Sequence, residues 1–164
     1  MLRNPTASVF LPSEDEWYKA AYYDPIASLY YDYPTGTNAI INCVAPGGDT
    51  GNSANCGGAV NALTDVGAYT LSDSPNGTFD QAGNLYEWNE EIKVGGTERG
   101  ARGGDFRTPV GFAAAFADNH GTLGDPDGGY DVVGIRVASI PEPSTGLLVM
   151  TGLLALAARR RWCA

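Results

Sequence analysis

The sequence predicts an α+β fold that is rich in irregular structure. Three observations support this class: one segment with strong helix-start signals, several short strand-like segments, and 22 glycines with 10 prolines among 164 residues. Hydrophobic residues make up 43% of the chain, which is too many for a disordered polymer. There are no internal repeats, and the length fits one domain better than two.

The predicted helix runs from about residue 14 to residue 23. Ser13 is a favoured N-cap, and Glu16, three residues later, completes a capping box. Further acidic residues in the first turn suit the positive end of the helix dipole. The small and aromatic residues of its apolar stripe, which we expect to pack closely against a sheet, are Trp17, Ala20 and Ala21.

Short elements separated by long loops are expected in the rest of the domain. Residues 24–64 are rich in Gly, Asn, Pro and Tyr and show no period, so they are predicted to be irregular. Residues 66–71 predict a short strand and residues 74–77 a turn. The glycine pair at 103–104 predicts a close backbone approach that leads into a strand at 105–106.

A final strand is predicted to close the domain. Val133, Ile135 and Val137 alternate with small or polar residues, so we expect these three side chains to face inward. Residues 1–139 are therefore assigned to one α+β domain, and residues 140–164 form a tail of different composition.

Charge separates the same two regions. All nineteen acidic residues, but only seven of the ten basic ones, precede residue 146, so that part carries a net charge of −12 and the whole chain −9. An acidic chain repels nucleic acid and attracts cations, and no nucleic-acid partner is expected.

The tail has the layout of a membrane-sorting segment. A Pro-rich break precedes an apolar run from Gly146 to Ala158, and three arginines end that run. As a helix the run spans about 20 Å, less than the roughly 30 Å of a hydrocarbon core. Runs of this size are also typical of buried core helices, but those carry polar residues on one face, and only Thr151 interrupts this one.

Over residues 140–162 this tail resembles the bacterial PEP-CTERM sorting signal. The residues that carry the resemblance are Pro141, Glu142 and Pro143, the short transmembrane helix 146–158, and Arg159, Arg160 and Arg161. The resemblance implies insertion in the inner membrane of a Gram-negative bacterium, cleavage by an exosortase, and release to the cell surface or extracellular matrix. Because no export signal opens the chain, we expect it to be the C-terminal part of a longer protein.

Two cysteines, Cys43 and Cys56, lie in the irregular segment. In an exported protein they can form a disulfide, worth about 3 kcal/mol by loop entropy. Their spacing does not fix the geometry, so two free thiols remain the alternative.

Residues 80–87 hold two carboxylates, Asp80 and Glu87, around a flexible glycine. Calcium takes about six to eight oxygen ligands and mixes carboxylates with backbone carbonyls, so this window can supply about half a coordination shell. From the residues alone, a solvated turn is the alternative.

Four ordered motifs resemble the formylglycine-generating enzyme, or sulfatase-modifying factor, family. They are residues 11–17 (LPSEDEW), 80–88 (DQAGNLYEW), 102–106 (RGGDF) and 134–138 (GIRVA). The resemblance covers about residues 9–139, matches the C-terminal half to two-thirds of the family domain, and implies a C-type-lectin-like α+β fold stabilised by Ca²⁺. It also implies calcium ligands, which are the side chains of Asp80 and Glu87, the carbonyls of Gly83 and Leu85, and Asn55 at the start of a second site.

The catalytic part of that family does not carry over to this chain. The copper-binding cysteine pair of the enzymes would fall near Thr108 and Ala113, and neither side chain can replace a thiolate. Relatives that use histidine-bound iron need more ligands than the single His120. We therefore expect calcium but no copper, and no catalytic residues.

The leading functional hypothesis is an exported, non-catalytic lectin-like module that binds an extracellular polysaccharide or matrix protein. Its variable loop would be residues 107–131, and the aromatic residues available there for contacts are Phe106, Phe112, Phe116 and Tyr130. Within it, residues 125–131 can grip a cation, form a sugar-binding rim or be a solvated turn. Two alternatives stay open: an oxidoreductase with altered metal ligands, and a purely structural surface protein.

Overall fold

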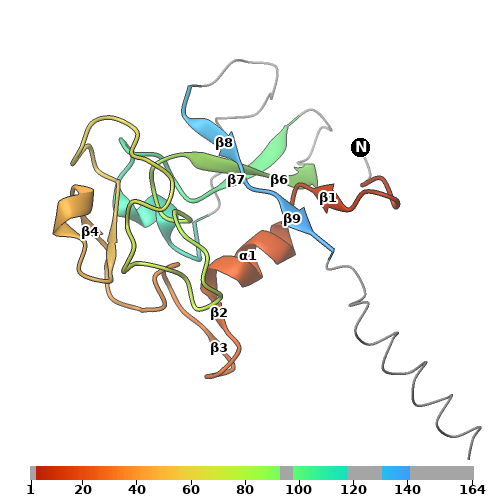
Figure 1. Cartoon of the computed structure of the whole chain (residues 1–164), viewed down its shortest axis with the longest axis horizontal. Helices are drawn as coiled ribbons and strands as arrows, with labels where there is room; N and C mark the ends of the chain where they lie inside the picture. The colour runs from red at the N-terminus through yellow and green to blue at the C-terminus, as the bar shows by residue number, and fades with distance from the viewer. Residues whose placement is uncertain (1–2, 93–97, 118–130, 141–164) are drawn as a thin grey trace, which may run out of the picture.

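The computed structural model describes residues 3–92, 98–117 and 131–140 (Figure 1). In chain order the elements are β1 (Val9–Phe10), α1 (Glu14–Tyr22), β2 (Tyr23–Asp24), β3 (Leu29–Tyr30), β4 (Asn42–Cys43), the 3₁₀-helix η1 (Pro46–Gly48), β5 (Ser53–Ala54), β6 (Tyr86–Ile92), β7 (Arg99–Arg102), the 3₁₀-helix η2 (Val110–Ala113), β8 (Val133–Ile135) and β9 (Ala138–Ser139). This combination of a helix with short strands and long loops confirms the predicted α+β class.

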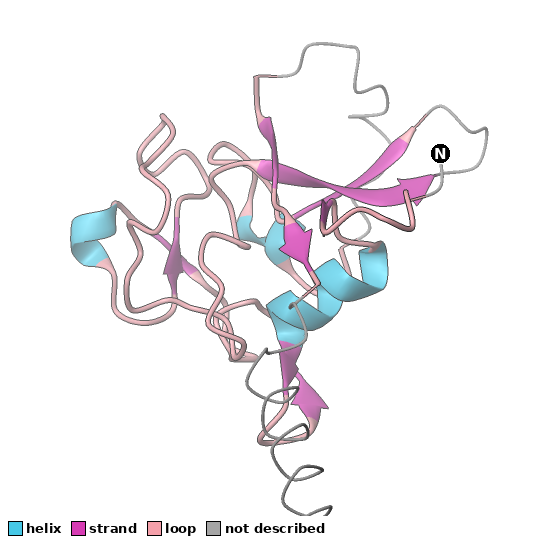
Figure 2. Ribbon diagram, turned by 45° about the vertical axis from the view of Figure 1, so that its right-hand side comes forward, coloured by secondary structure: helices cyan, strands magenta, loops and turns pink. Residues whose placement is uncertain are grey.

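The largest sheet has three strands in the order β7–β6–β8. Strand β6 runs antiparallel to β7 and parallel to β8, so Glu87 lies opposite Arg102 on one side and Gly134 on the other. Three further sheets have two strands each: β1–β9 and β2–β3 are antiparallel and β4–β5 is parallel. Figure 2 shows the helix below the main sheet and the loops grouped to one side of both.

Helix α1 begins where the sequence predicts and ends one residue earlier. The Ser13 hydroxyl accepts a hydrogen bond from the Glu16 amide at 3.2 Å, and the Glu16 carboxylate accepts one from the Ser13 amide at 2.7 Å. The capping box is therefore confirmed. Hydrogen bonds from Arg3 also lower the pKa of Glu16 to about 2.

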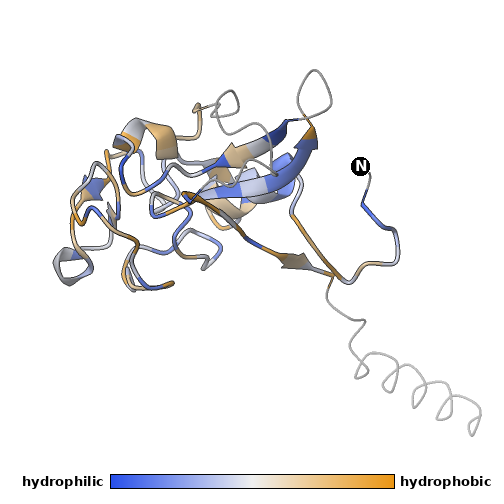
Figure 3. Cartoon of the chain, turned by 90° about the horizontal axis from the view of Figure 1, so that it is seen from above, coloured by the Kyte–Doolittle hydropathy of each residue, from blue (hydrophilic) through white to orange (hydrophobic). Residues whose placement is uncertain are grey.

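The apolar core is divided into three small clusters. One lies under the helix, one in the main sheet, and one around β4 and β5; their largest buried members are Trp17 and Tyr22, Tyr86, and Tyr33 and Ile41. Figure 3 shows that hydrophobic residues are spread through the loops, while β6 and β7 are largely hydrophilic. The fold consequently relies on polar contacts in its centre as well as on apolar burial.

The predicted strand over residues 66–71 is wrong, because this segment forms two turns. The Gly67 amide donates to the Asp80 carboxylate at 2.5 Å, and the Leu71 amide donates to the Asp49 carboxylate at 2.8 Å. The Asp49 and Asp80 carboxylates thus accept hydrogen bonds from backbone amides that, in a strand, would pair with a neighbouring strand. The predicted turn at 74–77 is confirmed by a hydrogen bond from the Gly77 amide to the Ser74 carbonyl at 2.8 Å.

The predicted strand at 105–106 is also wrong, although the close approach of the glycine pair is present. The strand, β7, precedes the glycines instead of following them. A Cβ on Gly103 would lie 3.1 Å from the Gln81 carbonyl oxygen, and the φ angle of Gly103 is +95°. The chain then turns, because the Asp105 carboxylate accepts from the Thr108 amide at 2.8 Å.

The closing strand is split, and two of its predicted inward residues face outward. Strand β8 pairs with β6 and β9 pairs with β1, with a break between Ile135 and Ala138. Ile135 is 68% exposed and Val137 is 59% exposed. Arg136 takes the inward position because the buried Glu87 carboxylate requires a cationic partner.

Within the three described ranges, no helix has both the length and the hydropathy needed to cross a membrane. The predicted helix 146–158, together with the sorting residues 141–143 and 159–161, lies outside the described residues.

Candidate functional site

Three of the predicted calcium ligands, Asp80, Leu85 and Glu87, line one cavity of about 150 Å³ beside β6 and β8. Its remaining lining residues are Val66, Asn84, Gly134, Ile135 and Arg136. The other two predicted ligands, Gly83 and Asn55, do not line this cavity but pair with each other through the backbone. The spacing of the two carboxylates in the sequence thus corresponds to a shared site in space.

Glu87 contributes a buried carboxylate with both oxygens engaged. Its Oε2 accepts from the Trp17 indole at 2.7 Å and from Arg136 Nε at 2.8 Å, and its Oε1 accepts from Arg136 Nη2 at 2.7 Å. Burial raises the pKa of Glu87, while the hydrogen bonds from Arg136 and Trp17 act in the opposite direction. This bidentate pair joins β6 to the segment after β8, and the indole joins both to α1.

Arg136 has a second partner, since its Nη2 also donates to the Phe79 carbonyl at 2.6 Å. The guanidinium therefore holds the residue before Asp80 as well as Glu87. Sequence alternation assigned Arg136 to the outer face, and its role was missed. A buried carboxylate requires a cationic partner nearby, and this requirement is the one signal that could have predicted the role of Arg136.

Asp80 adopts a left-handed backbone conformation with φ of +60°. Its Oδ2 accepts from the Gly67 amide at 2.5 Å, and among the described residues its Oδ1 has no hydrogen-bond partner. Non-glycine residues adopt this conformation only where the local structure requires it. Here it places the Asp80 side chain against the turn at residues 65–68. One carboxylate oxygen stays available to the cavity.

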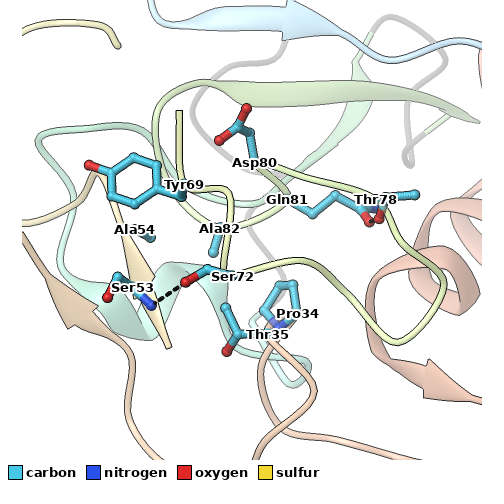
Figure 4. A pocket seen from close by; sticks show the side chains of 10 residues that line it. All are labelled: Pro34, Thr35, Ser53, Ala54, Tyr69, Ser72, Thr78, Asp80, Gln81 and Ala82. Carbon is cyan, nitrogen blue, oxygen red and sulfur yellow. Dashed lines mark hydrogen bonds between the residues drawn. The ribbon is translucent and has the colours of Figure 1, made fainter. Parts of the chain in front are cut away.

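A smaller cavity of about 10 Å³ adjoins Asp80 on another side (Figure 4). Its polar wall includes Ser53, whose amide donates to the Ser72 hydroxyl at 2.9 Å. Burial, with a contribution from the Asp80 charge, raises the pKa of Tyr69 on this wall to about 12. A space of this size holds at most one water molecule, so it is structural and not a ligand site.

Asn55 and Asn84 form a polar network between the irregular segment and the start of β6. The Asn55 amide group donates to Asn84 Oδ1 at 3.1 Å and to the Ala62 carbonyl at 2.8 Å, and the Thr64 amide also donates to Asn84 Oδ1 at 3.0 Å. Asn55 is fully buried, and within the part of the chain that the structure describes its Oδ1 has no hydrogen-bond partner. Because buried carbonyl oxygens are almost always paired, this atom is one that a water molecule or a cation would satisfy.

The donor set fits a hard cation in part. The free oxygen of Asp80 and the unpaired amide oxygen of Asn55 are ligands of the kind that calcium prefers. Glu87 has no oxygen to spare unless Arg136 moves away. The described ranges contain no cluster of three or more His, Cys, Asp or Glu side chains that could hold a metal.

The structure joins Cys43 and Cys56 by a disulfide, with their Cα atoms 4.9 Å apart. The bond links β4 to Cys56, the second residue after β5 and the direct neighbour of Asn55. Cys56 is 2% exposed and lies in the apolar cluster that also contains Ile41 and Ala54.

The two positions expected for a copper-binding pair have structural roles here. The Thr108 hydroxyl accepts a hydrogen bond from the Asp105 amide at 2.9 Å. The carbonyl oxygen of the buried Ala113 accepts one from the Tyr22 hydroxyl at 3.1 Å. Of the predicted contact residues, Phe112 is 41% and Phe116 79% exposed. Residues 118–130, with His120, Tyr130 and most of the 125–131 loop, lie outside the described residues.

Fold and tail together define an exported α+β protein with a cavity beside its central sheet. Residues 139–161 match the family model described as PEP-CTERM protein-sorting motif, which indicates export by the exosortase route. An 82-residue stretch, half of this chain, is 34% identical to hercynine oxygenase of Mycobacterium tuberculosis. That stretch covers 17% of the oxygenase, so the match is a partial one.

Among solved structures, the chain is similar to Treponema denticola variable protein 1, with a TM-score of 0.57 and 21% sequence identity. The likeness covers 81% of this chain and 48% of that protein. At this level of identity it shows a common fold alone. The chain thus spans about half the length of this structure and about a sixth of the length of the oxygenase.

Proposed function

We propose that this chain is an exported, non-catalytic, calcium-stabilised module of the cell surface or extracellular matrix, processed by an exosortase. The sorting motif at residues 139–161 carries the proposal, because a motif of this kind implies export by the exosortase route. The net charge of −12 over residues 1–145 suits an environment in which calcium is abundant. The lectin-like character is part of the proposal and rests on the motifs shared with the sulfatase-modifying factor family.

Calcium is proposed to bind at the cavity beside β6 and β8. Asp80 would supply its free carboxylate oxygen and Leu85 its carbonyl oxygen. Gly83 and Asn55, which do not line this cavity, stay proposed ligands beside it, and Asn55 would belong to a second site. Glu87 would contribute only if Arg136 gave up one of its two bonds. The proposed first ligand is accordingly Asp80.

Calcium removal is expected to destabilise the protein through Asp80. At a calcium concentration about 100 times Kd, binding adds about 2.7 kcal/mol to the free energy of unfolding. Thermal melts of the full chain with calcium and with chelator measure this difference. Asp80→Asn keeps an acceptor for the Gly67 amide but removes the charge, so it should abolish most of the calcium effect.

The matched control is Asp73→Asn, which makes the same charge change at an exposed residue. This variant should keep the full calcium effect. Identical melts with and without chelator in the wild-type chain would rule out the calcium proposal.

Phe116 is proposed to contact the extracellular ligand, because it is the more exposed of the two described phenylalanines in the expected binding segment. Phe116→Ala should weaken retention of the full chain on an exopolysaccharide or matrix preparation by about fivefold or more. Leu71→Ala, an exposed apolar residue elsewhere on the surface, is the control and should have no effect. Absence of retention for the folded wild-type chain would count against the binding function.

A second candidate is an oxidoreductase with altered metal ligands. The 34% identity to hercynine oxygenase over 82 residues favours it. Metal analysis of the purified full-length protein separates the candidates: the module predicts calcium only, whereas the oxidoreductase predicts stoichiometric iron or copper.

A further inference from the structure

The C-terminal end of α1 is capped by residues more than fifty positions away in the sequence. The last carbonyls of a helix lack partners within the helix. Here the side-chain amide of Asn76 donates to the carbonyls of Lys19 at 3.1 Å, Ala20 at 3.3 Å and Tyr23 at 2.7 Å. The Ser74 hydroxyl adds a bond of 2.9 Å to Ala20.

Asn76 sits in a chemically sensitive position. It is followed by Gly77, and this is the only Asn-Gly dipeptide in the sequence. Asn76 is exposed, and Gly77 has a φ of +73° with no atom near the place of a Cβ. Asparagine before glycine is the context in which the following backbone nitrogen reaches the side-chain carbonyl carbon with least hindrance.

We propose that Asn76 is a deamidation site whose conversion releases the end of α1. The Gly77 backbone nitrogen attacks Asn76 Cγ and loses its proton, a C–N bond forms, and the Cγ–Nδ2 bond breaks to release ammonia. Water then opens the resulting succinimide at either carbonyl and leaves aspartate or isoaspartate. No oxidant or reductant is needed, because the reaction consumes one water molecule and releases one ammonia.

The product cannot cap the helix. The amide is a double donor, whereas a carboxylate only accepts hydrogen bonds. Deamidation therefore replaces three favourable contacts by the repulsion of a negative charge from three carbonyl oxygens. The negative end of the helix dipole adds to that repulsion.

The same contacts restrain the reaction in the folded protein. The Gly77 amide is hydrogen-bonded to the Ser74 carbonyl at 2.8 Å, and the Asn76 amide is held against the helix. Attack requires both to open. The rate of deamidation thus follows opening of the 74–78 turn.

Peptide mapping of the full chain during incubation at mildly alkaline pH and 37 °C tests the site. Asn76 should be converted before every other asparagine, and Ser74→Ala, which removes one of the contacts, should accelerate it. Conversion of Asn76 at the same rate as Asn52 or Asn84 would overturn the proposal.

Asn76→Asp tests the consequence, with Asn38→Asp as the matched control. Both residues are exposed, but Asn38 uses its side-chain oxygen as an acceptor for the Asp32 amide, which an aspartate can also do. We expect Asn76→Asp to lower the melting temperature by about 4–8 °C and Asn38→Asp by much less. Equal melting temperatures for the two variants would show that conversion of Asn76 does not release the helix.

Discussion

Replacing Arg136 by methionine is expected to lower the free energy of unfolding by about 3–5 kcal/mol. The substitution leaves the buried Glu87 carboxylate without its cationic partner. A buried ion pair contributes little net stability when formed, but removal of one partner exposes the full desolvation cost of the other. Chemical denaturation followed by far-UV circular dichroism measures the change.

The loss should depend on pH in a defined direction. Burial already raises the pKa of Glu87, and without Arg136 the main opposing influence is gone. A carboxyl group whose pKa is higher in the folded than in the unfolded state favours folding below the unfolded-state value, about 4.3, and loses this contribution as the pH rises through the folded-state pKa. Arg136→Met should therefore be far closer to wild type at pH 4 than at pH 7.

Arg107→Met is the control for this prediction. Arg107 also pairs with carboxylates, Asp105 at 3.5 Å and Asp131 at 3.6 Å, but its side chain is 50% exposed. Its pair with the exposed Asp131 is a surface pair, which contributes about 0–1 kcal/mol, and the buried Asp105 carboxylate keeps hydrogen bonds from the backbone amides of Arg107 and Thr108. A loss for Arg136→Met no greater than that for Arg107→Met, or one that is the same at both pH values, would contradict the assigned role of the buried pair.

The sequence predicts those parts of the fold whose causes are local. The capping box needs only Ser13 and Glu16, and the turn at 74–77 needs only its own residues. The central strands β6 and β7 have no apolar alternation, since their buried positions include Glu87, Asn89 and Arg102. Periodicity therefore could not find them, and their formation depends on polar partners from other parts of the chain.

The candidate site shows the same division. Asp80 and Glu87 fall in one eight-residue window, which pointed to a shared site, and both line the same cavity. The partner of Glu87 could not be found in this way, because Arg136 reaches it only through the parallel pairing of β6 with β8. Likewise the segment at 66–71 has the composition of a strand, and only the distant Asp49 and Asp80 carboxylates convert it into turns.

Among the glycines that the structure describes, Gly83 is the one where an added methyl group is expected to disrupt the site most. Gly83 has a φ of +70°, and a Cβ there would fall inside van der Waals contact of the Asn55 carbonyl oxygen. That oxygen accepts the Asn84 amide at 2.8 Å and is followed by the disulfide-bonded Cys56, so it has no room to retreat. We expect a loss of about 4 kcal/mol or more, from strain together with the broken Asn55 and Asn84 contacts.

Gly58→Ala separates the two causes of that loss. Gly58 has a similar φ of +74°, but no atom lies within 4 Å of the place of its Cβ. Its substitution tests backbone strain without collision and should cost about 1–2 kcal/mol. If denaturant melts of the two variants agree within about 0.5 kcal/mol, the close approach of Gly83 to Asn55 does not hold the irregular segment against β6. A larger loss for Gly83→Ala, together with loss of the calcium effect, would instead show that this contact positions Asn55 next to the cavity formed by Asp80 and Leu85.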